Sequence, residues 1–112
     1  LHVNHANELS EKVLKSVTKI IDSGVPVLSQ TVLLRSVNDH FETLFNLFEK
    51  LIDNRIVPYY LHQLDRVQGA AHFEVSPGKG TELIAKLRAA LPGYAVPKYV
   101  REVSGFSQKS FI

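Results

Sequence analysis

The sequence predicts an α/β fold in which parallel strands alternate with helices, as in the carboxyl-terminal part of a (β/α) TIM-type barrel. Four strand candidates alternate with three helix candidates at a spacing of about 28 residues, the length of one βα unit. The run at residues 56–61 is apolar and aromatic throughout, as in a strand buried on both faces. It turns polar at its far end, where His62, Gln63 and Asp65 follow. In parallel barrels the carboxyl ends of the strands carry the functional groups.

The first half of the chain supplies two strands and one helix. Residues 1–4 form the stub of a first strand. The helix that follows ends near residue 23, before Gly24, and its apolar stripe consists of Leu9, Val13, Val17, Ile20 and Ile21. Residues 26–34 are predicted as the second strand.

The second half repeats this alternation. Asn38 is predicted to cap a helix that runs through residue 53, and the run at 56–61 is the third strand. Ser76 and Pro77 are typical of a helix start, and the helix after them carries an apolar stripe of Leu83, Ile84, Leu87 and Leu91. Residues 98–103 are predicted as the last strand, and a polar tail follows.

The length limits the architecture. A complete (β/α)₈ barrel needs about 200 residues or more, and this chain has 112. We therefore expect residues 1–103 to be carboxyl-terminal βα units of a larger barrel and residues 104–112 to be a tail.

The composition excludes several classes of protein. The formal charge of +2 is too small to favour nucleic acid or an anionic membrane as a partner. No apolar run approaches the roughly 20 residues of a membrane span. The chain has no cysteine, which excludes disulfides and thiolate metal sites and agrees with a cytoplasmic location.

Each polar residue near a predicted strand end has a structural alternative. Two histidines without a carboxylate or thiol partner are weak metal ligands, so His2 and His5 favour no metal site. Gln30, within an apolar strand, pairs either with backbone or with a ligand. From composition and spacing alone, Asp65, His72 and Lys109 are more often turn residues or solvated side chains than ligands. Tyr59 and Tyr60 are also explained as core aromatics whose hydroxyls reach the rim.

Four segments in order carry a resemblance to a known family. They are HVNHANE at 2–8, QTVLLRSVND at 30–39, PYYLHQLD at 58–65 and GAAHF at 69–73. Together they resemble the lysine 2,3-aminomutase family of radical S-adenosylmethionine enzymes. The chain is most similar to the branch that makes β-lysine for modification of elongation factor P, because it has His62 and Glu102 where lysine-degrading members have tyrosine and aspartate.

The resemblance implies three cofactors: S-adenosylmethionine, pyridoxal 5'-phosphate and a [4Fe-4S] cluster held by three cysteines. Since the chain has no cysteine, the cluster ligands would lie outside it, and the chain alone is expected to be inactive. Position by position, the resemblance implies that His2 and Gln30 bind S-adenosylmethionine and that Lys109 is the pyridoxal phosphate lysine. It implies cofactor contacts from Tyr59 and His62. It also implies that Asp65 and Glu102 bind the substrate ammonium group.

The resemblance also implies partners. We expect lysine as the small-molecule substrate, a functional link to elongation factor P and its lysine ligase, and a homo-oligomer. Two alternatives stay open at this point. One is a catabolic L-lysine 2,3-aminomutase, which shares the chemistry, and the other is a non-catalytic α/β binding domain.

Overall fold

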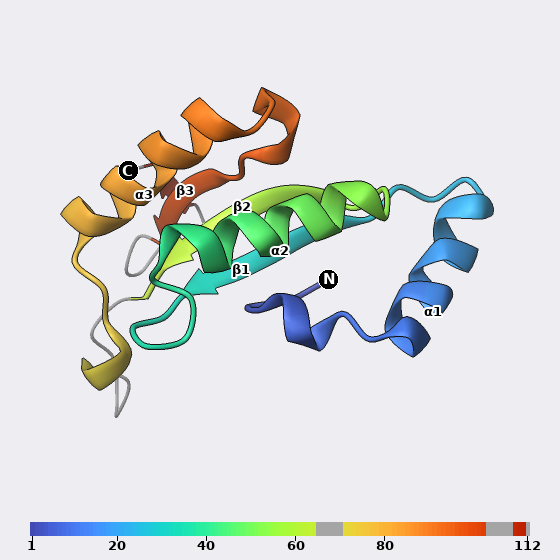
Figure 1. The fold of residues 1–112 in the computed structure, drawn as a ribbon, viewed down its shortest axis with the longest axis horizontal. Coiled ribbons are helices and arrows are strands. Elements are labelled where there is room, and N and C mark those ends of the chain that lie inside the picture. The colour runs from blue at the N-terminus through green and yellow to red at the C-terminus, as the bar shows by residue number, and fades with distance from the viewer. Residues whose placement is uncertain (65–70, 103–108, 112) are drawn as a thin grey trace.

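The computed structural model describes residues 1–64, 71–102 and 109–111. Three helices alternate with the first three strands (Figure 1). The helices are α1 (Glu11–Asp22), α2 (Phe41–Asp53) and α3 (Pro77–Ala90). The strands are β1 (Leu28–Leu33), β2 (Val57–Gln63), β3 (Lys98–Glu102) and β4 (Lys109–Phe111).

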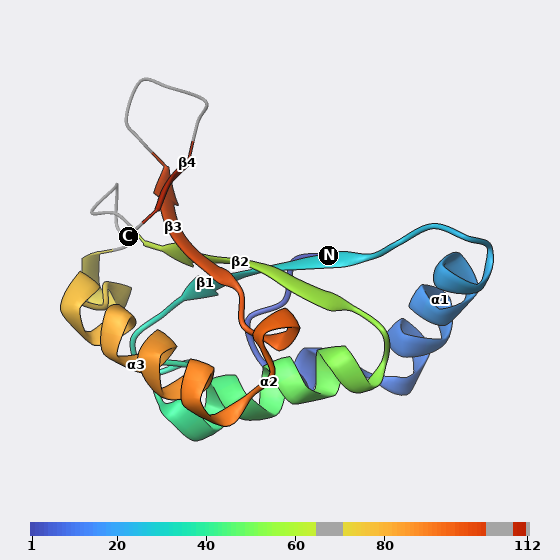
Figure 2. The ribbon, with the colours of Figure 1, turned by 90° about the horizontal axis from the view of Figure 1, so that it is seen from above.

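The sheet has the order β1-β2-β3-β4. The β1–β2 and β2–β3 pairs are parallel, which confirms a parallel sheet alternating with helices. Figure 2 shows α2 and α3 against one face of this sheet, while no helix of the described residues covers the other face. We call the two sides the helix-covered face and the uncovered face. Closure into a TIM-type barrel stays a prediction.

Both ends of the sheet differ from expectation. Residues 1–4 make only an isolated parallel bridge, His2 to Gln30, instead of a strand. At the other end, Lys109–Phe111 forms a short antiparallel strand against β3, where a polar tail was expected. Residues 103–108 lie outside the described residues, so the boundary expected after residue 103 stays a prediction.

Two helix starts show how local signals succeed or fail. Ser76 caps α3 as expected, since its hydroxyl accepts from the Lys79 amide at 3.3 Å. The predicted cap of α2 at Asn38 is wrong, because the N-cap is His40. The Asn38 side chain is fully buried and instead joins three backbone groups. It accepts from Leu34 N at 2.8 Å and donates to the carbonyl oxygens of Asn4 and Val32, both at 2.9 Å.

The hydrophobic core lies between the sheet and the helices. Phe48 and three leucines of α2 are fully buried against β1 and β2, and α3 adds Leu83, Ile84 and Leu87. The stripe predicted for α1 is less well covered. Only Val17 is buried within α1, and Ile20 is 46% exposed. In the described part of the chain, no helix is long and apolar enough to cross a bilayer.

A buried polar cluster on the helix-covered face joins β2, β3 and α3. The Tyr99 hydroxyl donates to Gln63 Oε1, and Gln63 Nε2 donates to the Val75 carbonyl at 2.5 Å. Burial raises the pKa of Tyr99 to about 12, partly offset by the nearby Arg101 guanidinium. Gly80 of α3 packs directly against the Tyr99 ring and has no room for a Cβ atom. This cluster fixes the end of β2 relative to the start of α3.

Candidate functional site

The uncovered face of the sheet carries a row of polar and aromatic side chains. Along β1, Ser29 and Thr31 are buried on the helix-covered face, while Gln30 is half-buried on the other. The register places His2 and Tyr60 on either side of Gln30 and pairs Tyr60 with Lys98. Four adjacent backbone segments therefore contribute one side chain each to this row.

A hydrogen bond links the row to the end of β2. His62 Nε2 lies 2.8 Å from Gln30 Oε1. His62 follows Tyr60 by two residues and so belongs to the same face, where diagonal neighbours on adjacent strands can reach each other. The Tyr60 and His62 rings are 5.6 Å apart. The structure therefore brings together Gln30, which the resemblance assigned to S-adenosylmethionine, and His62, which it assigned to cofactor contacts.

A β-bulge places both tyrosines of β2 near this face. The register runs from Ser29–Pro58 directly to Gln30–Tyr60, so Tyr59 is an extra residue without a partner in β1. The two tyrosine rings meet edge to face at 4.5 Å. Bulges re-aim side chains and are frequent beside functional sites. Here the bulge adds the Tyr59 ring without interrupting the row.

Lys98 is a site residue that sequence reasoning missed. Its Nζ lies 4.6 Å from the centroid of the Tyr59 ring, within the range of a cation–π contact. The signal in the sequence was the two-residue periodicity of a strand along residues 98–102, which places residues 98 and 100 on the same face of the sheet. The site therefore includes a positive charge beside the aromatic residues.

The predicted substrate and pyridoxal phosphate positions lie at the far edge of the sheet. Glu102 and Lys109 are backbone partners in the antiparallel β3–β4 pair. Positions that are seven residues apart in the sequence thus become neighbours. Asp65 lies outside the described residues, so the structure does not test its relation to the pair.

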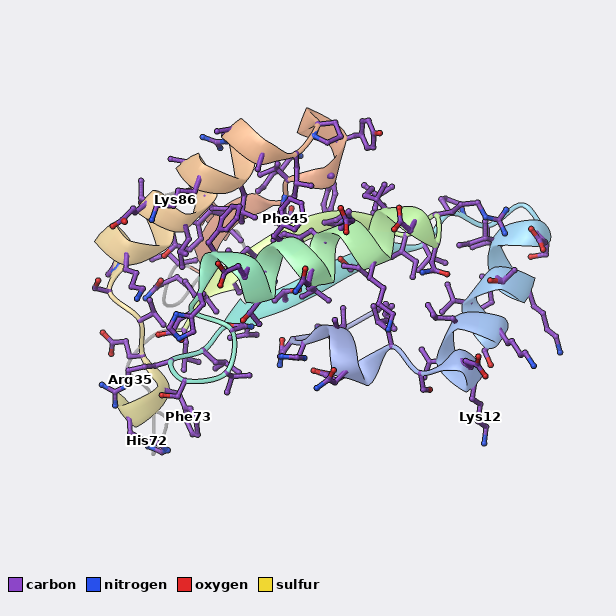
Figure 3. The ribbon with its side chains drawn as sticks, in the orientation of Figure 1. Lys12, Arg35, Phe45, His72, Phe73 and Lys86 are labelled. Carbon is purple, nitrogen blue, oxygen red and sulfur yellow. The ribbon has the colours of Figure 1, made fainter. Side chains whose placement is uncertain are left out.

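Two other histidines, His5 and His72, make local contacts that agree with a structural role. His5 Nδ1 accepts from the Asn7 amide at 3.1 Å and caps the short turn Ala6–Glu8. His72 is exposed in the turn Ala71–Phe73, and its ring contacts that of Phe73. Figure 3 shows this turn beside Arg35, whose amide donates to the Phe73 carbonyl at 2.8 Å. Among the described residues, no three histidine or acidic side chains lie together so that they could hold a metal ion.

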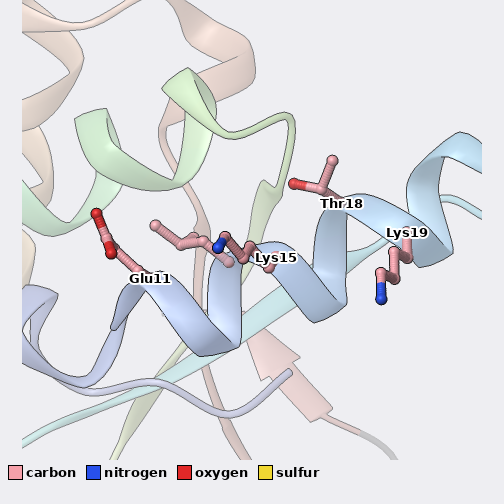
Figure 4. Close-up of a pocket in the computed structure, with 5 residues that line it drawn as sticks. Glu11, Lys15, Thr18 and Lys19 are labelled. Carbon is pink, nitrogen blue, oxygen red and sulfur yellow. The ribbon is translucent and has the colours of Figure 1, made fainter.

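A hollow of about 460 Å³ runs along α1 (Figure 4). None of the predicted site residues lines it. It is formed by one face of this helix: Glu11, Leu14, Lys15, Thr18 and Lys19. The candidate site therefore remains the row on the uncovered face.

Comparison with known proteins identifies the relatives of this chain. No family model matches it. The chain is 47% identical over 109 residues to the L-lysine 2,3-aminomutase of Escherichia coli (strain K12), covering 97% of the chain and 32% of that protein. Against the enzyme of the same name from Methanococcus maripaludis it is 42% identical over 104 residues, covering 93% of the chain and 24% of the relative. With that of Clostridium subterminale it shares 39% identity over 109 residues, 97% of the chain and 26% of the relative.

The similarity extends along nearly the whole chain, as the four motifs led us to expect. The chain spans about a quarter to a third of the length of these relatives. The segment of the relatives that this chain matches is carboxyl-terminal. The chain is therefore a homologue of the L-lysine 2,3-aminomutases over almost all of its own length.

Proposed function

We propose that the chain forms part of a radical S-adenosylmethionine, pyridoxal phosphate-dependent aminomutase that converts L-α-lysine to β-lysine. The observation that carries the proposal is the 47% identity to a protein named L-lysine 2,3-aminomutase over 97% of the chain. The uncovered face supports it, because a half-buried amide, two histidines and two tyrosines gather there. Such groups suit a polar cofactor better than they suit a dry core.

The side chains present fit two of the three implied cofactors. His2 and Gln30 offer hydrogen-bonding groups for S-adenosylmethionine, and Tyr59 and His62 offer ring surfaces for pyridoxal phosphate. Lys109 supplies the amine for the second cofactor. The [4Fe-4S] cluster does not fit, since it requires thiolates and the chain contains no cysteine. We therefore assign its ligands to a part of the enzyme outside this chain.

The roles of the residues follow from their chemistry. The bound cofactors supply the radical and carbonyl chemistry that moves the amino group between adjacent carbon atoms. The chain holds the reacting groups. Asp65 and Glu102 hold the substrate ε-ammonium by charge-assisted hydrogen bonds, which set the reach and charge of the accepted amino acid. A lysine in the role of Lys109 needs an unprotonated amine, which desolvation or neighbouring positive charge favours.

The decisive experiment assays the intact gene product for β-lysine formation from L-lysine, with both small cofactors and a reconstituted cluster. We expect product from the wild type and none from Lys109→Ala. Lys12→Ala is the matched control, because Lys12 is an exposed lysine on α1. Absence of β-lysine from the wild-type protein would overturn the proposal, as would unchanged turnover in Lys109→Ala.

For the destination of the product we propose modification of elongation factor P. His62 and Glu102 support this branch, because lysine-degrading members have tyrosine and aspartate at these positions. The catabolic enzyme is the second candidate, and the identical names of the relatives leave both possible. Deleting the gene should abolish the β-lysyl group on elongation factor P, as read by intact-protein mass spectrometry. Retention of that group would favour the catabolic role.

We also propose that the protein is a cytoplasmic homo-oligomer. Light scattering of the intact gene product should give a mass of at least two copies. A monomer at high concentration would remove this part of the proposal.

A further inference from the structure

The edge of β1 that faces residues 1–4 changes its hydrogen-bond partners partway along the strand. At Gln30 the partners are backbone groups. The Gln30 amide donates to the Leu1 carbonyl at 2.8 Å, and the Val3 amide donates to the Gln30 carbonyl at 3.0 Å. These two bonds place His2 opposite Gln30 in the parallel bridge.

Two asparagine side chains replace the neighbouring backbone at Val32, two residues further along β1. In a regular parallel pair, the amide and the carbonyl of Val32 would both bond to backbone groups of the next strand. Instead the Val32 amide donates to Asn4 Oδ1 at 2.9 Å, and the Val32 carbonyl accepts from Asn38 Nδ2 at 2.9 Å. The backbone pairing therefore ends at Val3, and side chains occupy the place of a continuing strand.

The orientation of the Asn38 amide is fixed by its partners. Carbonyl oxygens only accept hydrogen bonds, so its NH₂ group must face the carbonyls of Asn4 and Val32, both at 2.9 Å. Asn38 Oδ1 then faces the Leu34 amide at 2.8 Å, and the whole side chain is buried. One NH₂ group thus joins β1 to the segment that contains Asn4.

We infer that Asn38 is a positioning residue for His2. His2 lies two residues before Asn4, so the bond from Asn38 to the Asn4 carbonyl holds this segment against β1 directly beyond His2. Thr31 adds a second bond from the helix-covered face, because its buried hydroxyl donates to the Val3 carbonyl at 2.6 Å. Without the NH₂ group of Asn38, two carbonyl oxygens would lose their donor and the segment would be free to move away from β1.

The consequence for binding rests on the proposed function, in which His2 and Gln30 bind S-adenosylmethionine. A ligand held by both side chains requires a fixed separation between them, since a displacement of about 1 Å weakens a directional hydrogen bond. Asn38 is fully buried and acts through the backbone instead of touching the ligand. Its loss should therefore weaken the binding of S-adenosylmethionine more than that of lysine, which is assigned to Asp65 and Glu102.

The first variant is Asn38→Asp in the intact gene product with a reconstituted cluster. The carboxylate keeps an acceptor for the Leu34 amide but puts an oxygen in place of the NH₂ group. We expect the Kd of S-adenosylmethionine, measured by isothermal titration calorimetry, to rise by about tenfold or more, as for loss of one ligand hydrogen bond. The KM for lysine should change by less than about twofold, because its contacts are retained.

A second measurement needs no ligand. Hydrogen exchange of the intact gene product, read by mass spectrometry, reports the Val3 and Gln30 amides that bracket His2. In Asn38→Asp both amides should exchange faster by about tenfold or more, because the edge opens locally. Unchanged exchange at both amides would show that Asn38 does not hold this segment and would overturn the inference.

Thr31→Val is the milder variant, and it decides the question if Asn38→Asp does not fold. It keeps the shape of the side chain and removes the donor to the Val3 carbonyl. It should raise the same Kd by about two- to fivefold. Ser29→Ala is its matched control. Ser29 Oγ is buried on the same face of β1 but has no hydrogen-bond partner among the described residues, so the Kd should stay unchanged.

Tyr99→Phe is the control for lost stability, since it removes a buried hydrogen bond on the helix-covered face. Its Kd for S-adenosylmethionine should equal that of the wild type. An equal rise of the Kd in Tyr99→Phe and Asn38→Asp would show a general effect of destabilisation and overturn the inference. An unchanged Kd in both Asn38→Asp and Thr31→Val would also overturn it.

The two proposals fail in different ways. If the wild-type protein makes no β-lysine and binds no S-adenosylmethionine, the proposed function fails. The exchange of the Val3 and Gln30 amides then decides alone whether Asn38 holds His2 in place. If the wild type is active and the Asn38 and Thr31 variants bind S-adenosylmethionine normally, only the positioning role fails.

Discussion

Two glutamines on neighbouring strands, Gln63 and Gln30, have opposite environments. Gln63 is 7% exposed on the helix-covered face, and both ends of its amide are paired, with Tyr99 and with the Val75 carbonyl. Gln30 is half-buried on the uncovered face, and only its oxygen has a partner among the described residues. A buried amide with every group satisfied stabilises the fold, whereas a partly exposed amide with a remaining donor suits a ligand.

The comparison shows how one strand serves both purposes. Alternation along β2 sends Gln63 to the helix-covered face and His62 to the other face. The carboxyl end of β2 is therefore held in place by its side chain on the helix-covered face, while its next side chain lies on the uncovered face. Changes on the helix-covered face should alter stability, and changes on the uncovered face should alter activity.

The largest effect on stability is expected from Gly80→Ala. The new Cβ would overlap the Tyr99 ring, which is 4% exposed and held by Gln63, so it cannot move aside. We expect a loss of about 3 kcal/mol in the free energy of unfolding, measured by urea titration. Gly78→Ala is the control, because nothing lies within 4 Å of its added Cβ, and it should gain up to about 1 kcal/mol. Equal stability of the two variants would mean that Tyr99 is free to move.

The second effect is a loss of stability at high pH. Burial raises the pKa of Tyr99 from 10.0 to about 12. The unfolded chain therefore loses this proton at lower pH than the folded chain does. The stabilising contribution is fully present below pH 10 and disappears as the pH rises through about 12, a loss of about 2–3 kcal/mol. Urea titrations across this range should show that the loss is smaller in Tyr99→Phe. An identical pH dependence in the two proteins would contradict the burial of this phenol.

The third effect concerns the substrate carboxylates. Asp65→Asn or Glu102→Gln should lower kcat/KM for L-lysine in the intact enzyme by about 10- to 150-fold, if each charged hydrogen bond contributes about 1.5–3 kcal/mol. Cofactor absorbance should be unchanged. Glu82→Gln is the control, since Glu82 forms an exposed i,i+4 pair with Lys86 and should be silent. Unchanged lysine affinity in both site variants would place the ammonium site elsewhere.

Much of the fold could be predicted from local patterns. The apolar run of β2 with its polar end and the Ser76-Pro77 start of α3 are signals within a few residues. The four motifs similarly pointed to the family. These features need no knowledge of distant contacts, because periodicity and capping act over one or two turns.

The remaining features depend on contacts distant in the sequence. Asn38 has the local signature of a helix cap, but three backbone groups, one of them 34 residues away, engage its side chain instead. The three residues of β4 are too few to show periodicity. The bulge at Tyr59 and the site position of Lys98 follow from strand register, which no short segment specifies. The pairing of Gln30 with His62 likewise spans 32 residues and requires the parallel sheet.

The most direct test of the division between the two faces is kcat/KM for L-lysine in Gln30→Leu. The free energy of unfolding should change by less than about 1 kcal/mol, because water can replace the partner of a half-buried group. The catalytic efficiency of the intact enzyme should nevertheless fall by about tenfold or more, as expected for loss of one ligand hydrogen bond. Full activity in Gln30→Leu at unchanged stability would show that the uncovered face is not the functional one.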